Sequence, residues 1–208
     1  MRPLCLVGMS GIGKSFWAQR LAAERGFLRH DCDAEIAAGL ATLAPVAPGE
    51  APVHALGRWM GMPWSSGYAE REAQYLALEE RVTRRALAAV RETVGAHVLD
   101  TTGSVIYLPD DLLAGLRETC RVVYLRTPER WRDAMLERYR LEPKPVVWDG
   151  AFEPRDGEAV IDALPRCFAE LLRRRDERYA ALAHVVLDGA ALETTKPTLD
   201  AWLAACGA

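Results

Sequence analysis

Long apolar runs, an excess of positive charge and clustered cysteines are all missing from this 208-residue sequence. No apolar run approaches the roughly 20 residues that cross a bilayer, and the run at residues 4–7 is too short for a signal peptide. A formal net charge of -3 provides no global positive field for nucleic acid. We therefore expect a cytoplasmic protein that binds neither membranes nor nucleic acid.

The cysteines are scattered, with no CxxC pair and no histidines at metal-ligand spacing. We interpret all of them as reduced thiols; they are Cys5, Cys32, Cys120, Cys167 and Cys206. Half of the residues are hydrophobic and 26% are charged, a balance that excludes disorder and fibrous repeats. No repeat and no linker divides the chain, so we expect a single domain over residues 1–208 and a monomer.

Short β-rich runs alternate with longer segments of helical periodicity. Leu4–Val7 is an apolar run closed by glycine, and helical spacing follows over Lys14–Glu24. Further β-rich runs lie at Phe27–Asp31, His97–Leu99, Val122–Leu125 and Val185–Leu187. Strands that alternate with helices predict an α/β fold of three layers, in which helices cover a five-stranded parallel sheet.

Two segments rich in proline and glycine, Ala44–Gly67 and Leu141–Gly157, show no regular periodicity. Both are longer than ordinary loops. Segments of this kind are often lids or binding loops, and an ordinary surface insertion is the alternative.

Residues 8–15 read Gly-Met-Ser-Gly-Ile-Gly-Lys-Ser and match the phosphate-binding pattern GxxxxGK[ST] between a strand and a helix. Glycines let the backbone aim its N–H groups at phosphates, and the helix N-terminus adds partial positive charge. Lys14 would bridge the β- and γ-phosphates of ATP, and Ser15 would ligate Mg²⁺. A chance glycine-rich turn is the alternative. The predicted nucleotide-binding residues of this loop are Gly8, Gly11, Ile12, Gly13, Lys14, Ser15 and Phe16.

Two aspartates follow the second expected strand. Alternation places Asp31 and Asp33 on the same side of an extended segment. Asp31 would hold metal-bound water, and Asp33 would accept the proton of an attacking hydroxyl. The alternative for Asp33 is an N-cap for a helix that begins at Ala34.

These motifs, taken in order, resemble shikimate kinase. Residues 11–15 are followed by Asp31-x-Asp33, whose second acid lies nineteen residues after Lys14. Residues 98–105 resemble the family's strand and glycine-rich substrate loop, and Lys144-Pro145-Val146-Val147 resembles the Arg-Pro-Leu-Leu of its lid. Residues 175–179 resemble its C-terminal segment with a substrate-binding arginine.

The resemblance implies a P-loop kinase that uses ATP and Mg²⁺ to phosphorylate a hydroxyl of a small, carboxylated metabolite. It implies substrate contacts from Asp33, Thr102, Gly103 and Arg175, and a nucleotide contact from Lys144. It also implies a substrate-side insertion at about residues 44–67 and a mobile helical lid at about residues 139–158. A gluconate-type or nucleoside-type kinase and a non-catalytic nucleotide-binding module stay open as alternatives.

The sequence departs from the family on the acceptor side. Leu76 stands where the family's Phe-Arg-x-x-Glu segment has arginine, and Thr102 and Ser104 replace glycines, which adds bulk and hydroxyl groups. Helical spacing places Arg71 one turn earlier, on an inward face. We predict that Arg71 clamps an anionic acceptor together with Arg175; a solvent-tipped arginine is the alternative.

Two further charged positions concern the nucleotide and its metal. Lys144 keeps the charge of the family's lid arginine without its planar fork, for which Arg138 or Arg140 would compensate. Asp100, at the end of the third expected strand, is a candidate to orient Mg²⁺ through water. A hydrogen bond that caps the following turn is an equal alternative for Asp100.

Arg175 interrupts an apolar stripe. Residues 160–182 have the periodicity of a helix with its apolar side chains at Ile161, Leu164, Phe168, Leu171, Leu172, Tyr179 and Leu182. Because Arg175 falls within that stripe, it must snorkel or turn its guanidinium to a partner inside the fold. An anionic substrate is the predicted partner, and a structural ion pair is the alternative.

Overall fold

The computed structural model describes residues 2–207. Five strands form one sheet in the order β2-β3-β1-β4-β5, and every neighbouring pair is parallel. The strands are β1 Leu4–Val7, β2 Leu28–Asp31, β3 His97–Asp100, β4 Arg121–Arg126 and β5 Val185–Asp188. The sheet confirms the predicted α/β architecture.

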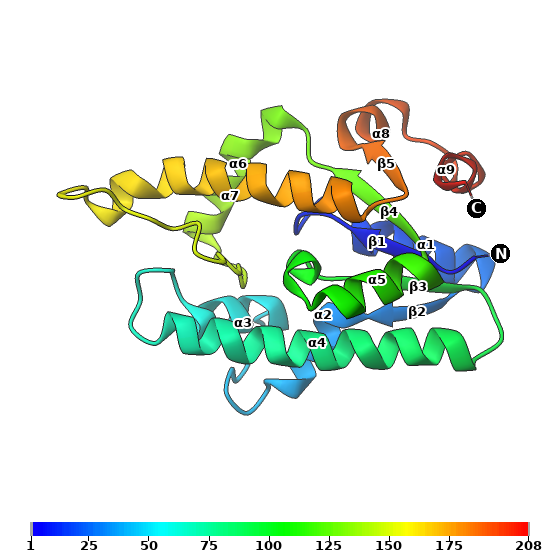
Figure 1. The fold of residues 1–208 in the computed structure, drawn as a ribbon, viewed down its shortest axis with the longest axis horizontal. Helices are drawn as coiled ribbons and strands as arrows, with labels where there is room; N and C mark the ends of the chain where they lie inside the picture. Colours follow the sequence, from blue (N-terminus) through cyan, green and yellow to red (C-terminus); the bar gives the residue numbers. More distant parts are fainter. Residues whose placement is uncertain (1, 208) are drawn as a thin grey trace.

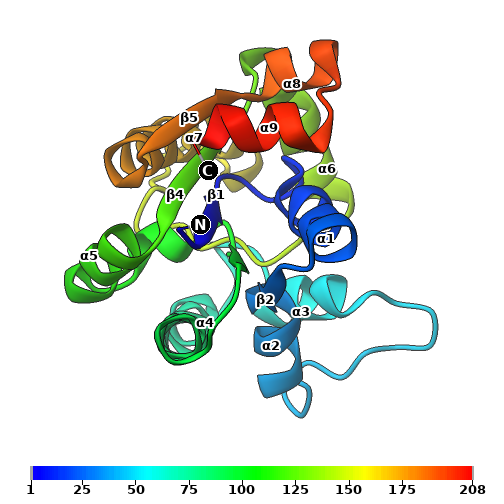
Figure 2. The same ribbon diagram turned by 90° about the vertical axis from the view of Figure 1, so that its right-hand side faces the viewer.

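Helices cover both faces of the sheet and give three layers (Figures 1 and 2). Strand β1 shows how the sequence sets them: Leu4 and Leu6 pack with one helix layer, Cys5 and Val7 with the other, and all four are fully buried. The first layer contains α1 Lys14–Arg25 and α9 Leu199–Cys206; the second contains α4 Tyr68–Glu92, α5 Asp110–Thr119 and α7 Val160–Leu182.

The remaining elements are α2 Cys32–Gly39, α3 Pro52–Met60, α6 Arg132–Leu141 and α8 Gly189–Thr195, with single 3₁₀ turns at Val105–Tyr107 and Glu129–Trp131. The carboxyl ends of parallel strands meet at one edge of the sheet, which is where ligands bind in open α/β folds. The segments after β1, β2, β3 and β4 therefore converge on one candidate site. Within residues 2–207, no helix has both the length and the apolarity to cross a bilayer.

The segment 44–67, predicted to be irregular, contains helix α3. Pro52 occupies the first turn of this helix, and Gly61 follows its end with a positive φ of 76°. Proline suits the start of a helix and glycine suits its end, so the residues that looked like loop signals are helix boundaries. The helix buries Leu56 and Met60 against the core.

The segment 139–158, predicted to be a helical lid, is helical only to Leu141, where α6 ends. Pro143 and Pro145 lack N–H donors, which prevents the helix from continuing. Figure 1 shows the chain leaving α6 toward α3 and α4 before it returns to α7. The lid is thus an extended loop, which we define as residues 142–159.

Buried groups attach the lid loop to helix α4. Trp148 is 1% exposed, and its backbone N–H donates to Glu72 Oε1 at 2.5 Å. The Tyr68 hydroxyl donates to the carbonyl of Val146 at 2.6 Å. Since these bonds join the lid loop to a long core helix, they fix the residues that enter the candidate site.

Helix α7 confirms the range predicted for it, Val160–Leu182. The predicted apolar stripe is buried apart from Ile161, which lies in the first turn and is 48% exposed. Arg175 is only 3% exposed, so this arginine lies inside the fold and does not snorkel to solvent.

Candidate active site

The phosphate loop connects β1 to α1 as the sequence predicts. Gly13 is the N-cap of α1 with φ 102°, and a Cβ there would meet no atom within 4 Å. Glycine is therefore required by the backbone conformation and not by packing. No side chain caps α1, so its first N–H groups are left for an anion.

Lys14 is buried beneath this loop. Its Nζ donates to the carbonyls of Gly8 at 2.9 Å and Met9 at 3.1 Å. Burial lowers the pKa of Lys14, and the nearby carboxylates of Asp33 and Asp100 oppose that change. The ammonium group is thus poorly solvated and only partly compensated, which favours an incoming phosphate.

The two aspartates after β2 do not share one side of an extended segment, and that prediction is wrong. The strand ends at Asp31, and α2 already begins at Cys32. Asp31 is the N-cap, since its Oδ1 accepts from the N–H of Ala34 at 3.0 Å. The capping alternative for Asp33 is therefore also wrong, because its neighbour has that role.

Asp33 lies in the first turn of α2 and is partly buried. Its pKa is raised to about 6, mainly by burial; the charges of Asp100 and Asp31 contribute to the rise, and Lys14 and Lys144 oppose it. A carboxylate that titrates close to neutral pH beside a phosphate loop has the properties of a general base.

Arg29 joins the other two acids. Its Nη2 lies 2.6 Å from Asp31 Oδ2 and 2.6 Å from Asp100 Oδ2. Sequence reasoning gave Arg29 no role, although two-residue alternation along β2 places it on the same side as Asp31. Asp100 is 2% exposed, and within residues 2–207 its Oδ1 has no hydrogen-bond partner.

Of the predicted metal residues, Ser15 and Asp31 line one pocket. Ser15 is exposed and lines a pocket with Asp31 and Asp33. Across residues 2–207 no group of three or more histidine, cysteine or acidic side chains is arranged to hold a metal ion. Ser15 and Asp31, together with Asp100 Oδ1, which has no hydrogen-bond partner within residues 2–207, fit a Mg²⁺ ion that keeps several water molecules and is bound mainly by phosphates.

A second pocket adjoins the first and receives most of the predicted substrate residues. The two pockets share Ser10, Asp33, Val53 and Lys144. The second is further lined by Met9, Tyr75, Gly103, Ser104, Pro145, Val146 and Arg175. The structure thereby brings Asp33, Gly103 and Arg175 together, as predicted, and places Lys144, which was predicted to contact the nucleotide, beside them.

Arg175 enters this second pocket, which we call the acceptor pocket, from α7. Its guanidinium donates to the carbonyl of Val147 at 2.7 Å, to that of Gly103 at 3.2 Å and to the Tyr107 hydroxyl at 3.3 Å. No carboxylate among residues 2–207 forms an ion pair with it, so the structural ion pair is not observed. The buried charge is solvated only by neutral groups.

Lys144 reaches both pockets because α3 packs against the lid loop. A Cβ on Gly57 would lie 2.0 Å from the carbonyl oxygen of Pro143 and 2.9 Å from Lys144 Cα. Only glycine permits this approach of α3 to the lid. Gly57 is a positioning residue that the sequence analysis missed, since one glycine inside a helix gives no signal of what it contacts.

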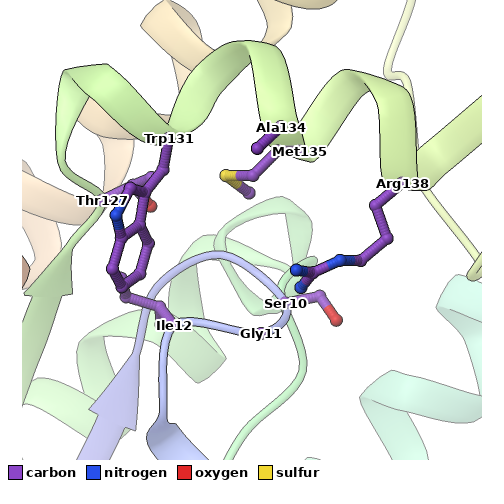
Figure 3. Close-up of a pocket in the computed structure, with 8 residues that line it drawn as sticks. All are labelled: Ser10, Gly11, Ile12, Thr127, Trp131, Ala134, Met135 and Arg138. Atoms are coloured by element: carbon purple, nitrogen blue, oxygen red, sulfur yellow. The ribbon is translucent and has the colours of Figure 1, made fainter.

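A third pocket lies between the phosphate loop and helix α6 (Figure 3). Trp131 and Met135 line it, and the Arg138 side chain extends toward the loop. A Cβ on Gly11 would lie 3.6 Å from Arg138 Nη1, which places the guanidinium directly over the loop. The buried hydroxyl of Thr127, at the edge of this pocket, has no partner within residues 2–207.

No family model and no curated protein sequence matches the chain. Among solved structures, it is similar to a shikimate kinase from Acinetobacter baumannii in complex with shikimate, with a TM-score of 0.63 and 23% identity over 98% of this chain and 94% of that one. Shikimate kinases from Bacteroides thetaiotaomicron and Aquifex aeolicus each give a TM-score of 0.54 and 16% identity, over 90% and 86% of the two chains. The chain has the shikimate kinase fold.

On this shikimate kinase fold, Arg71 does not take the place of the missing arginine. Its Nε donates to the Met60 carbonyl at 3.0 Å and its Nη2 to that of Ser66 at 2.9 Å. Arg71 lines neither pocket around Asp33. The predicted clamp with Arg175 is therefore corrected: the turn between α3 and α4 folds back on the first turn of α4, and its carbonyls take the guanidinium.

The positions where Thr102 and Ser104 replace glycines surround a carboxyl group that the sequence analysis left without a role. Glu79 is fully buried; Ser104 Oγ lies 2.6 Å from its Oε2, and the Thr102 hydroxyl contacts its Oε1. Thr102 is thus turned away from the acceptor pocket, toward Glu79. The available signal was periodicity, since Glu79 lies four residues after Tyr75 and three before Val82 on the apolar face of α4.

Proposed function

We propose that this chain is an ATP-dependent kinase that phosphorylates a hydroxyl of a small metabolite carrying a carboxylate. One observation carries the proposal: the buried guanidinium of Arg175, without a carboxylate partner in residues 2–207, lines a pocket with Asp33 beside the phosphate loop. Buried charges are normally paired, so a substrate anion would complete the environment of Arg175.

The acceptor-side chemistry follows from the placement of Asp33. The acceptor hydroxyl loses its proton to the Asp33 carboxylate as its oxygen forms a bond to the γ-phosphorus of ATP. The bond between that phosphorus and the bridging oxygen breaks, and ADP leaves with the bonding electron pair. Lys14 lies beneath the loop, where its charge stabilises the negative charge of the transferring group.

Mg²⁺, when bound with ATP, supplies neutralisation of the phosphate charges. Ser15 would be its protein ligand, and Asp31 and Asp100 would orient its water molecules. Arg29 contacts one oxygen of each acid, which reduces their combined negative charge and leaves Asp100 Oδ1 for a hydrogen bond from water.

The nucleotide would extend from the phosphate loop toward the third pocket. Arg138 and Lys144 line one pocket together with Ser10 and Gly11 of the loop, and together they would supply the charge of the family's single lid arginine. Trp131 and Met135 offer apolar surface for the base and sugar. The unpartnered Thr127 hydroxyl would give that end of the site one polar contact.

The test is incubation of the full chain with ATP, Mg²⁺ and a panel of hydroxylated acids, sugars and nucleosides, with ADP release as the readout. Shikimate, which the Acinetobacter baumannii enzyme binds in its structure, is the first probe. We expect turnover with hydroxy acids and a rate lower by about 100-fold or more in the Asp33→Asn variant. Turnover of nucleosides alone would favour a nucleoside-type kinase, and ATP binding without turnover would favour a non-catalytic module.

Arg175→Met separates the acceptor site from the nucleotide site. Loss of a charge-assisted hydrogen bond of about 1.5 to 3 kcal/mol should raise the KM of the acceptor roughly tenfold or more. The KM for ATP should not change. Equal effects on both substrates would argue against a carboxylate contact at Arg175.

A further inference from the structure

Three oxygen-bearing side chains form a closed triangle behind the acceptor pocket. The Ser104 oxygen lies 2.6 Å from Glu79 Oε2 and 3.1 Å from the Thr102 oxygen, and the Thr102 hydroxyl contacts Glu79 Oε1. Three hydrogen bonds need three protons. Two hydroxyls supply only two, so the triangle is complete only when Glu79 is a neutral carboxylic acid.

In the complete triangle Glu79 donates to Ser104, Ser104 donates to Thr102, and Thr102 donates to Glu79. The backbone N–H of Ser104 donates to the Thr102 side-chain oxygen at 3.1 Å, which holds the loop of residues 102–104 in this conformation. If Glu79 were ionised, both hydroxyls would point at it, and the 3.1 Å contact would join two oxygens with no proton between them. In both arrangements the hydroxyl proton of Ser104 is used inside the protein.

We propose that Ser104, held by this ring with Thr102 and Glu79, is a specificity-determining residue that selects an acceptor with a second hydroxyl group. Ser104 lines the acceptor pocket with Asp33 and Arg175. Because its own proton is committed, it presents only an oxygen lone pair to the pocket, where the Tyr75 hydroxyl is its protein neighbour and a substrate hydroxyl would compete for that lone pair. A hydroxyl can donate to that lone pair, whereas a carboxylate or phosphate oxygen would be repelled.

The inference rests on the proposed function and narrows its substrate class to polyhydroxylated acids. One hydroxyl meets Asp33 and is phosphorylated, a second donates to Ser104, and the acid group meets Arg175. Glycines at residues 102 and 104 would offer no such side-chain contact, so the selection arises from this chain's own residues.

The charged and titratable groups that face Glu79 come from several elements: Cys32 and Asp33 of α2, Tyr75 of its own helix, and Arg175 and Tyr179 of α7. Burial raises the pKa of Glu79 to about 7; the two hydroxyls and Arg175 oppose the rise, and Asp33 adds to it. A neutral Glu79 at mildly acidic pH is thus consistent with the geometry.

The first measurement needs no substrate. Infrared spectra are recorded on the full-length Asp33→Asn variant in D₂O at about pH 6, because this substitution removes the other carboxyl group whose pKa is raised. The spectrum should show a carboxylic-acid C=O band, and the additional substitution Glu79→Gln should remove that band. Glu80→Gln, at the next position of α4, is the control and should keep the band. Ser104→Ala should shift it by removing one ring member. Absence of a Glu79-dependent band would overturn the ring.

The second measurement uses matched acceptors. Shikimate, quinate and D-gluconate are each paired with analogues that lack one hydroxyl, and ADP release is followed for the wild type and Ser104→Ala. One pair should differ in the hydroxyl group that donates to Ser104. For that pair we expect the wild type to prefer the hydroxylated compound by about three- to tenfold in kcat/KM, and the Ser104→Ala variant to lose that preference.

The outcomes separate the two hypotheses. Phosphorylation without discrimination in every pair, or discrimination that Ser104→Ala leaves unchanged, overturns the role of Ser104 while the kinase assignment stands. No turnover with any pair while ATP still binds overturns the proposed function and the substrate role of Ser104 together, and the infrared band still reports whether the ring exists.

Discussion

Replacement of Asp33 by asparagine should make the protein more stable while it removes activity. Asp33 has a pKa of about 6 in the folded chain against an ordinary 3.8. At about 1.4 kcal/mol per pKa unit, ionised Asp33 destabilises the folded state by about 3 kcal/mol at neutral pH. The side chain is partly exposed, so solvent screening lowers the expected gain in the variant to about 1–3 kcal/mol.

The sign depends on pH. The folded-state pKa is raised, so the folded chain retains this proton between pH 3.8 and about 6 while the unfolded chain has lost it. Stability from Asp33 is therefore present below that window and is lost as the pH rises through it. An asparagine side chain cannot titrate, so the Asp33→Asn variant should exceed the wild type in stability at about pH 8 and match it near pH 4.

Urea unfolding at these two pH values measures this difference, and ADP release measures the loss of turnover, which should be about 100-fold or more for a general base. Equal unfolding free energies at the higher pH would refute the electrostatic argument. A stabilised variant that retains turnover would leave the electrostatics intact and remove Asp33 from catalysis.

Three further substitutions test other parts of the site. Lys14→Met should lower turnover about 100-fold or more in a folded protein, because its charge acts on the transferring phosphoryl group; near-normal turnover would refute the assignment of the phosphate loop. Gly57→Ala should destabilise the protein and raise the KM for ATP, because the new Cβ would overlap the Pro143 carbonyl and displace Lys144. In an unobstructed helix interior the same substitution would stabilise the protein by up to about 1 kcal/mol. A more stable variant would therefore show that α3 does not press on the lid loop. Arg71→Met should lower the free energy of unfolding by about 1–3 kcal/mol through loss of its bonds to Met60 and Ser66, and a tenfold rise in acceptor KM would instead restore Arg71 to the substrate site.

The parts of the site that are contiguous in sequence were predictable. The phosphate loop combines a strand, a glycine pattern and a helix within residues 4–25, so each local preference agrees with the fold. Arg175 was also predictable as a buried arginine, because α7 is long enough for its apolar stripe to define an inward face. In both cases the information lies within one element and its immediate neighbours.

The errors arose where tertiary contacts override local patterns. Asp31 and Asp33 alternate correctly for a strand, but the strand ends at Asp31 because that side chain caps α2. Arg71 has an inward position by periodicity, but the preceding turn folds back and supplies carbonyls for it. Neither sequence pattern contains the path of the neighbouring chain, which decides where a side chain finds its partner.

The electrostatics of the site explain why a ligand belongs there. Lys14 and Asp33 carry opposite charges and influence each other. A stable ion pair would lower the pKa of Asp33 and raise that of Lys14, yet the pKa of Asp33 is raised and that of Lys14 is lowered. Burial therefore outweighs their mutual attraction. Arg175, whose hydrogen-bond partners are neutral, adds a second positive charge that no ion pair within residues 2–207 compensates. Phosphates at Lys14 and an acid group at Arg175 would replace the missing solvation of both cations. Asp33 would lose its unfavourable buried negative charge when it takes up a proton during the transfer. The charges that destabilise the folded chain are thus the ones that binding and proton transfer would stabilise.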